Sequence, residues 1–361
     1  MTSKLIKNIL IIVTVIVLIS VIISSLLPFY WGDKTQHVKV DYYKQNSEQF
    51  NTLFFGGSLE YRHISPHIID KIANDNHLDI KSFNFGIDGH NIIQELRDIQ
   101  GILKIKNDSL KQIFISVSSE PYFFAFNRHT AKWISWQNFS SYINAMRVIP
   151  TLKEDSYKTR AKYSYYYTSS LIENKLNMGI MPDALENLIF NTSLDTNYLG
   201  KYKDGFLSYD EEENLLLEYN WEVDLVKESR NAFINDKTHR DSLNQTVLAS
   251  FNNYEPTDKP NKQMVKLLQN LIKQCSKKGI DVYFVLPPKA RTSYSLLLPV
   301  FNALPKNRCI SLADIRQYPE FYSFEYGYNF HHLNNKGAQL YSKILAQKIV
   351  QLFQQNQQAV R

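Results

Sequence analysis

The chain has 361 residues, of which 44% are hydrophobic and 21% are charged, and its formal net charge is +6. These proportions exclude a disordered chain and allow one large domain or two small ones. The positive charge is mild and is not gathered into a basic cluster, so nucleic acid is not expected as a partner.

The first predicted element is an N-terminal membrane anchor. No charged residue occurs in the 23 residues from Ile9 to Trp31, and a helix needs about 20 residues to cross the hydrocarbon core. Lys4 and Lys7 precede this stretch, which favours a cytoplasmic N-terminus and an extracytoplasmic remainder. A cleaved signal peptide is the alternative, but its apolar region usually has about 7–15 residues and a small-residue cleavage site. We therefore expect residues 1–32 to form a retained transmembrane anchor.

After the anchor, residues 33–50 are polar and predicted to be a linker, and residues 51–361 are predicted to form an α/β domain. Here short apolar runs typical of buried strands alternate with helical patterns. The predicted strands cover 51–56, 79–85, 111–117, 280–286 and 308–312, and the predicted helices cover about 65–75, 90–105, 261–278, 293–303 and 335–354. This alternation predicts a flavodoxin-like, three-layer fold in which helices cover both faces of a parallel sheet.

The alternation is interrupted between about 121 and 260. This range holds Trp133, Trp136, the tyrosine-rich YSYYYTSS at 163–170 and the acidic DEEEN at 210–214. We interpret it as a mostly helical cap, inserted between the third and fourth strands.

Polar residues follow the predicted strands where each strand ends. In an open parallel sheet, ligands bind outside the carboxyl ends of the strands. The candidate residues are Ser58 after the first strand, Asn84 and Gly86 after the second, Ser119 after the third, and Asn329 and His332 before the terminal helix. We expect them to gather at one edge of the sheet.

Ser58 and His332 have the chemistry of a nucleophile and its base. A serine hydroxyl attacks a carbonyl only when a base removes its proton, and histidine is the usual base near neutral pH. A third group must orient the imidazole, and the developing oxyanion needs hydrogen-bond donors. The alternatives are a turn serine that caps a helix and a loop histidine, with His331 as the second candidate for the base.

The order of these motifs resembles the SGNH (GDSL-like) hydrolase superfamily. Within it, the chain looks like the membrane-anchored envelope branch that includes the D-alanyl transfer protein DltD and alginate O-acetylation proteins. FFGGSLEYRHISP resembles the first block, with its G-x-S; FNFGIDGHN resembles the second, N-x-G-x-x-G; and NFHHLNNKGAQLYS resembles the last, D-x-x-H-L-N-x-x-G-A. The resemblance covers roughly 51–120 and 261–354. It implies an SGNH-hydrolase-like fold, Ser58 as nucleophile, His332 as base, and Gly86 with Asn84 at the oxyanion hole.

Two positions depart from this pattern. Asn329 stands where the family has the aspartate that orients the histidine, and an asparagine accepts a hydrogen bond without supplying charge. The third block reads VSSEP where the family often has G-x-N-D, so Ser119, or Ser118 beside it, is the candidate donor there. Both departures reduce the expected activity.

Two further patterns have competing readings. Glu60, His63 and His67 have the spacing of metal ligands on one helix face, but Pro66 falls between the histidines, so we predict no metal there. Arg62 is either a binding group for an anion or a solvated charge.

Together these patterns predict a membrane-anchored, extracytoplasmic serine esterase or O-acyltransferase. The expected location at the membrane favours envelope polysaccharide or glycan esters as substrates, and the reaction would pass through an acyl-serine intermediate. Acyl transfer would require a membrane-bound O-acyltransferase as partner, whereas the chemistry itself requires no cofactor. The alternative is an inactive SGNH-like module that binds glycan or scaffolds an envelope assembly.

Overall fold

The computed structural model of the chain describes residues 2–117, 129–152, 156–179, 195–215, 220–289 and 294–360. It contains two compact units. The first comprises Met1–Val40 and Pro121–Leu194, and the second comprises Asp41–Glu120 and Asp195–Arg361. The range 121–260, predicted as one cap, is therefore shared between the units: its first part belongs with the N-terminal helix and its second part with the sheet.

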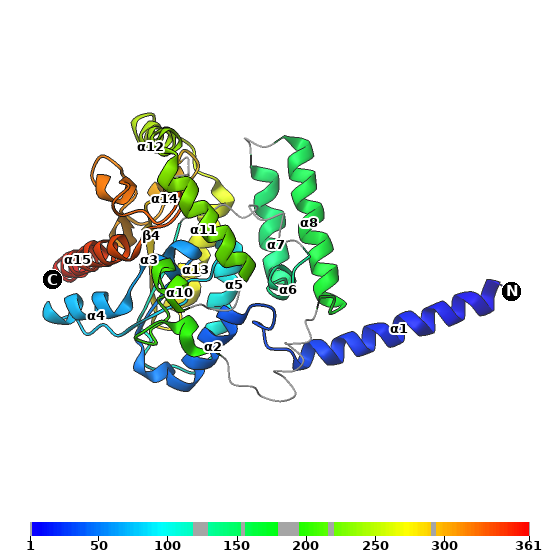
Figure 1. Cartoon of the computed structure of the whole chain (residues 1–361). Coiled ribbons are helices and arrows are strands. Elements are labelled where there is room, and N and C mark those ends of the chain that lie inside the picture. Colours follow the sequence, from blue (N-terminus) through cyan, green and yellow to red (C-terminus); the bar gives the residue numbers. More distant parts are fainter. Residues whose placement is uncertain are drawn as a thin grey trace. The chain divides into compact units, whose positions relative to one another are not determined.

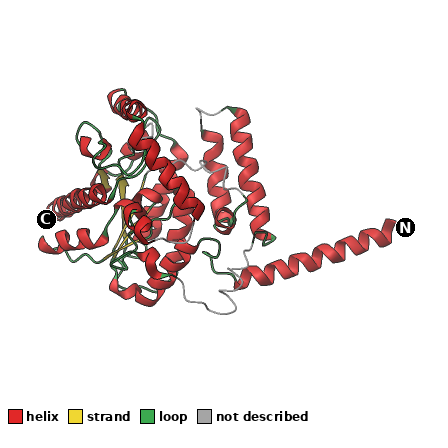
Figure 2. Cartoon of the chain, viewed as in Figure 1, coloured by secondary structure: helices red, strands yellow, loops and turns green. Residues whose placement is uncertain are grey.

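The second unit is built on a five-stranded sheet in which every strand pair is parallel (Figures 1 and 2). Its strands are β1 (Thr52–Phe55), β2 (Ser82–Asn84), β3 (Gln112–Ser116), β4 (Asp281–Leu286) and β5 (Cys309–Ser311). Each strand lies inside a predicted range, and helices flank the sheet, so the predicted α/β fold class is confirmed. The strand order is β2-β1-β3-β4-β5. From β1 the chain adds β2 on one side and β3 on the other, and ligands bind in such sheets at this switch point between β1 and β3.

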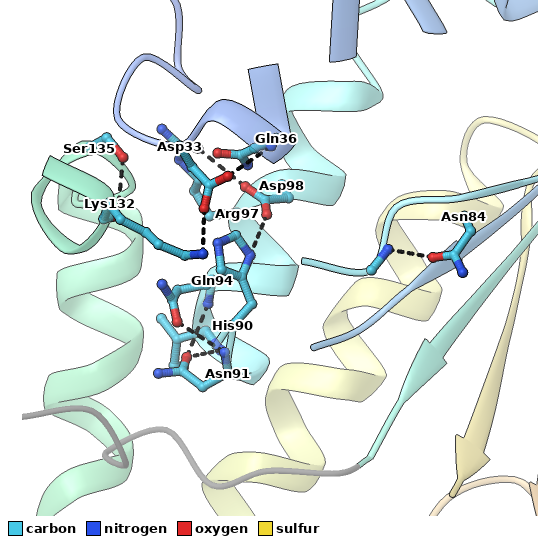
Figure 3. Close-up of polar contacts among 12 residues, drawn as sticks. Asp33, Gln36, Asn84, His90, Asn91, Gln94, Arg97, Asp98, Lys132 and Ser135 are labelled. Carbon is cyan, nitrogen blue, oxygen red and sulfur yellow. Dashed lines mark hydrogen bonds and ion pairs between the residues drawn. The ribbon is translucent and has the colours of Figure 1, made fainter. Parts of the chain in front are cut away.

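The helices of the second unit surround this sheet. They are α3 (Ser58–His63), α4 (Pro66–Asp75), α5 (Ile92–Ile102), α10 (Tyr209–Leu215), α11 (Asn220–Asn235), α12 (Lys237–Asn252), α13 (Lys262–Ser276), α14 (Leu297–Asn302) and α15 (Asn335–Val360). The short 3₁₀ helices are η1 (Ser47–Gln49), η4 (Thr196–Leu199), η5 (Lys306–Arg308) and η6 (Pro319–Tyr322). The helix starts follow local sequence: Asn91 caps α5 through a capping box with Gln94 (Figure 3), and Pro66 occupies the first turn of α4.

Aromatic side chains form the core on one face of the sheet. Phe54, Phe114 and Tyr283 are register partners on β1, β3 and β4 and form stacked pairs with ring centroids 5.0 Å apart. Phe353 of α15 covers them, with its ring centroid 5.2 Å from that of Tyr283. Because side chains alternate along a strand, Phe55 points to the opposite face, where it stacks on Phe85.

The first unit consists of α1 (Thr2–Leu26) with α6 (Ala131–Ser135), α7 (Phe139–Val148), η3 (Ile149–Thr151) and α8 (Tyr157–Lys175). Trp133, Trp136 and Tyr167 pack edge to face in its core. An ion pair of 2.8 Å joins Asp33 to Lys132 (Figure 3). Within the described residues, the segment Lys4–Leu26 is the one helix long and apolar enough to cross a membrane, with a mean hydropathy of 3.1.

Residues 33–50, predicted as a linker, contain a helix. α2 (Lys34–Asn46) and η1 occupy this range, and the division between the two units falls inside α2. Val38, Val40 and Tyr43 of α2 are buried. These few apolar positions provide the packing that the polar composition of the segment concealed, because helices are stabilised mainly by the face that they bury.

Candidate functional site

Ser58 lies at the carboxyl edge of the sheet, directly after β1. It is the first residue of α3 and is half-buried. Gly57 precedes it, and a Cβ added there would stand 2.9 Å from the carbonyl oxygen of His90. A glycine is therefore required for this close approach, which fixes the path of the chain as it leads the serine out of the strand.

His332 reaches Ser58 from the loop before α15. Its Nε2 lies 2.8 Å from the Ser58 Oγ. The loop ends where Asn334 Oδ1 accepts a 2.8 Å hydrogen bond from the N–H of Gly337 in the first turn of α15, an N-cap contact. The structure thus brings together the predicted nucleophile and base, which are 274 residues apart in the sequence.

Asn329 sets the tautomer of His332. Its Oδ1 accepts hydrogen bonds of 2.9 Å from the backbone N–H groups of both His331 and His332, an Asx turn in the loop itself. These two donors identify the atom as oxygen, so the His332 Nδ1, 3.1 Å away, must carry the proton. The Nε2 is left as an acceptor facing the Ser58 hydroxyl, as a general base requires.

Burial keeps His332 in its neutral form. Burial lowers its pKa well below the ordinary value of 6.5, and the nearby His63, His331, Arg62 and Lys289 lower it further. The ring of Tyr209 packs edge-on against the imidazole, with centroids 4.8 Å apart. The unprotonated base is therefore available at neutral pH.

His63 is a residue of this site whose role sequence reasoning missed. Its Nε2 accepts a 2.9 Å hydrogen bond from the N–H of Leu333, which ties the histidine loop to the helix that carries Ser58. Burial lowers the pKa of His63 to about 3, so it remains a neutral acceptor. The position of His63, five residues after Ser58 in the sequence, was the only signal, and it was read as metal spacing.

The metal reading has no structural support among the described residues, where no three His, Cys, Asp or Glu side chains are grouped to hold an ion. The ring of His67 stacks on Tyr202, with centroids 3.9 Å apart. Glu60, the third member of the predicted spacing, is buried beside the sheet.

The predicted oxyanion residues Asn84 and Gly86 bind each other. The N–H of Gly86 donates a 2.7 Å hydrogen bond to Asn84 Oδ1 (Figure 3). The Asn84 Nδ2 donates to the carbonyls of Glu60 and Ile64, each at 2.7 Å. Asn84 therefore holds α3 at the sheet edge and occupies the Gly86 donor. The third predicted donor, Ser119, lies outside the described residues.

Arg62 is neither a free anion-binding group nor a solvated charge. Its guanidinium is buried and pairs with Asp88 and with Glu212, the latter at 2.8 Å. It also stacks between the rings of Tyr61 and Tyr209, 4.1 and 4.3 Å from their centroids. Its charge is thus compensated inside the protein, and it supports the Tyr209 ring that packs on His332.

Glu60 of the serine helix α3 and Glu95 of α5 carry buried carboxyl groups that influence each other. Burial raises the pKa of Glu60 to about 7. Burial, with the charges of Glu60 and Asp98, raises the pKa of Glu95 well above its ordinary value. Protonated carboxyls are therefore favoured there, as expected for acids held away from water.

A small pocket adjoins His332, and Asn329 is part of its lining. Apolar and aromatic side chains make up much of its lining, among them Phe233, Leu243, Phe321 and Phe330, and the lining also includes Arg240. This lining offers apolar contacts beside His332.

Comparisons with known proteins give no assignment. The chain matches no protein-family model, and a search of curated proteins finds no match either. The function is therefore argued from the geometry of the site.

Proposed function

We propose that this protein is a membrane-anchored, extracytoplasmic serine esterase or O-acyltransferase of the SGNH type, acting on cell-envelope glycan esters. The observation that carries the proposal is the hydrogen-bonded chain from Ser58 Oγ through His332 to Asn329 Oδ1. Nucleophile, base and orienting group in this geometry are the parts that acyl transfer requires.

In the proposed reaction, Ser58 Oγ attacks the ester carbonyl carbon while its proton passes to His332 Nε2. Collapse of the tetrahedral intermediate breaks the bond to the alcohol, which leaves with the proton from His332. An acyl-serine remains. His332 then removes a proton from water or from a glycan hydroxyl as that oxygen attacks the acyl carbon; the bond to Ser58 Oγ breaks, and His332 returns the proton to Ser58 Oγ. Asn329 orients the ring throughout but supplies no negative charge to the imidazolium.

The oxyanion requires donors other than the N–H of Gly86. Because α3 begins at Ser58, the N–H groups of Ser58 and Leu59 have no carbonyl four residues earlier in the same helix. The proposal assigns these two groups to the oxyanion. The apolar pocket beside His332 supports binding of an acyl group, and none of these steps needs a cofactor.

The proposed membrane location rests on α1. Its apolar length supports anchoring, and Lys4 and Lys7 before it favour a cytoplasmic N-terminus. The site would then face the cell envelope, whose glycans offer hydroxyl groups to acylate or esters to cleave. If the reaction is transfer, a membrane-bound O-acyltransferase is the expected partner that delivers the acyl group.

Two observations favour a second function. The N–H of Gly86 is engaged by Asn84, and the residue that orients His332 is uncharged. Both features weaken transition-state stabilisation, and they favour a glycan-binding or scaffolding module that retains the fold without catalysis.

Labelling of Ser58 separates these functions. Full-length protein in detergent is treated with a fluorophosphonate probe and assayed with p-nitrophenyl acetate. We expect a probe adduct on Ser58 that Ser58→Ala abolishes. Ser323→Ala is the matched control, because Ser323 lines the pocket beside His332 and its hydroxyl donates to the carbonyl of Glu320. Folded wild-type protein that takes up no probe would instead support the binding module.

A further inference from the structure

Exposed apolar side chains gather at one end of the helical bundle in the first unit. At the end of α8, Ile172, Leu176 and Met178 are 53%, 42% and 52% exposed, and Phe139 at the start of α7 is 63% exposed. The Lys175 Nζ lies 5.5 Å from the centroid of the Phe139 ring, which places the two helix ends together. We call these four apolar residues the α8-end patch.

The same end of α8 is bound to α1 (Figure 1). The Ser20 hydroxyl donates to the carbonyl of Lys175, and the Asn177 Nδ2 donates to the carbonyl and hydroxyl oxygens of Ser20, both at 2.7 Å. Ser24 Oγ donates to Asn177 Oδ1 at 2.9 Å. These bonds satisfy the polar groups of α1 within the protein, as a membrane helix requires.

The position of Ser20 along α1 sets the depth of this contact. If the bilayer ended below Ser20, only Ile9–Ile19 of the uncharged stretch would remain inside it, and these 11 residues span about 16 Å at about 1.5 Å per residue. The hydrocarbon core is about 30 Å thick and needs about 20 residues. The bilayer must therefore extend past Ser20 toward the end of α1 at Leu26, to the level of the residues that Ser20 binds.

We propose that the α8-end patch enters the outer part of the lipid bilayer, so that the first unit is held by α1 and by a second, monotopic contact. Lipid is the occupant that the geometry favours, because the patch is joined to a helix that itself requires a bilayer. Lys175 suits this position, since a lysine at a membrane interface can lay its aliphatic stem along apolar groups and extend its ammonium to the phosphates of the headgroups. The inference rests on the membrane anchoring proposed above and not on the acyl chemistry.

Single cysteine labels in the full-length protein test this contact. Leu176→Cys carries an environment-sensitive nitrobenzoxadiazole label, and Tyr157→Cys at the opposite end of α8 is the matched control, because Tyr157 is 81% exposed. Burial raises the pKa of Cys275 to about 11 and of Cys309 to about 12, so an exposed introduced thiol reacts first at neutral pH. The labelled proteins are reconstituted into phosphatidylcholine vesicles.

We expect a nitroxide on the lipid acyl chains to quench the label at position 176 at least threefold more than the label at position 157, and aqueous iodide to show the reverse order. Met178→Cys repeats the measurement in case Leu176→Cys does not fold. Equal iodide quenching at both ends of α8 would overturn the inference. So would a label at 176 that is shielded from iodide but unaffected by the lipid nitroxide, because a second copy or another protein would then cover the patch.

Flotation of the wild-type protein with the vesicles distinguishes failure of the membrane anchor from failure of the patch to enter the bilayer. If the protein does not float, both the anchor and this inference fail. If it floats with position 176 in water, the inference fails while the anchor stands. Probe labelling of Ser58 reports on the acyl chemistry independently of both results.

Discussion

In the second unit the carboxyl edge of the sheet buries ionisable side chains, whereas in the first unit the end of α8 exposes apolar ones. Glu60, His63 and Glu95 are almost fully buried, while Phe139 and Ile172 are more than half exposed. Buried polar groups and exposed apolar patches are the informative exceptions to ordinary burial. The contrast fits the two proposals made above, a reacting substrate at the edge of the sheet and lipid at the end of α8, because each unit departs from the rule at the place where a partner is proposed.

The largest expected effect tests the buried side of this contrast. His332→Ala removes the base that contacts Ser58 Oγ, and we expect loss of at least about 10⁴-fold in kcat/KM for p-nitrophenyl acetate. The adjacent His331→Ala keeps the backbone N–H that bonds to Asn329, so a loss below about tenfold is expected. Equal losses in the two variants would contradict the assignment of His332 as the base.

A smaller effect concerns stability and pH. Burial raises the pKa of Glu60 from 4.5 to about 7 in the folded protein, so its contribution to stability is complete below pH 4.5 and is lost as pH rises through 7. At about 1.4 kcal/mol per pKa unit, the loss is about 3 kcal/mol at alkaline pH. We expect Glu60→Gln to remove this loss, which denaturant unfolding at pH 5 and pH 9 would measure.

The control for this prediction is Glu320→Gln, because Glu320 is exposed. Its free energy of unfolding should follow that of the wild type at both pH values. A Glu60→Gln variant whose stability falls with pH as steeply as that of the wild type would show that this carboxyl is not the group that titrates.

Much of the second unit could be predicted from sequence, because each buried strand is a short apolar run and several helices, such as α5, α13 and α15, have a periodic pattern or a cap. The meeting of Ser58, Asn329 and His332 was also predicted, since they follow a strand or precede a helix at one edge of the sheet. The pairing of Gly86 with Asn84 was not predicted, because an Asx contact over two residues looks the same in sequence as a turn that offers its N–H to a ligand.

The first unit was harder to predict for a different reason. Its α1 was identified by length and hydropathy alone, but its contact with α8 depends on Ser20 and Asn177, which are 157 residues apart. No local pattern reports such a contact. The acidic and tyrosine-rich range 121–260 has no periodic break near Leu194, so its division between the two units was invisible to composition.

A third prediction concerns the orienting residue. Asn329→Ala removes the acceptor for His332 Nδ1 and should cost about 10²-fold in kcat/KM. Asn329→Asp keeps the acceptor and adds a negative charge, which raises the pKa of His332 by about 1–2 pH units. Since His332 acts as the neutral base, the acidic limb of the pH–rate profile should move to higher pH by the same amount. An unchanged limb would mean that the titration of another group limits the rate.

The smallest expected effect concerns a buried hydrogen bond in the first unit, the unit that exposes apolar side chains. The buried Trp133 Nε1–H donates a 2.7 Å hydrogen bond to Ser170 Oγ. Ser170→Ala leaves this donor unsatisfied and should destabilise the first unit by about 1–2 kcal/mol. Ser169→Ala is the matched control, because its hydroxyl only bonds back to the carbonyl of Tyr166 in the same helix, where alanine costs nothing. Hydrogen exchange should then rise in α6 and α8 for Ser170→Ala alone, while the rate of probe labelling at Ser58 stays unchanged; a slower labelling rate would mean that the integrity of the helical bundle controls the site.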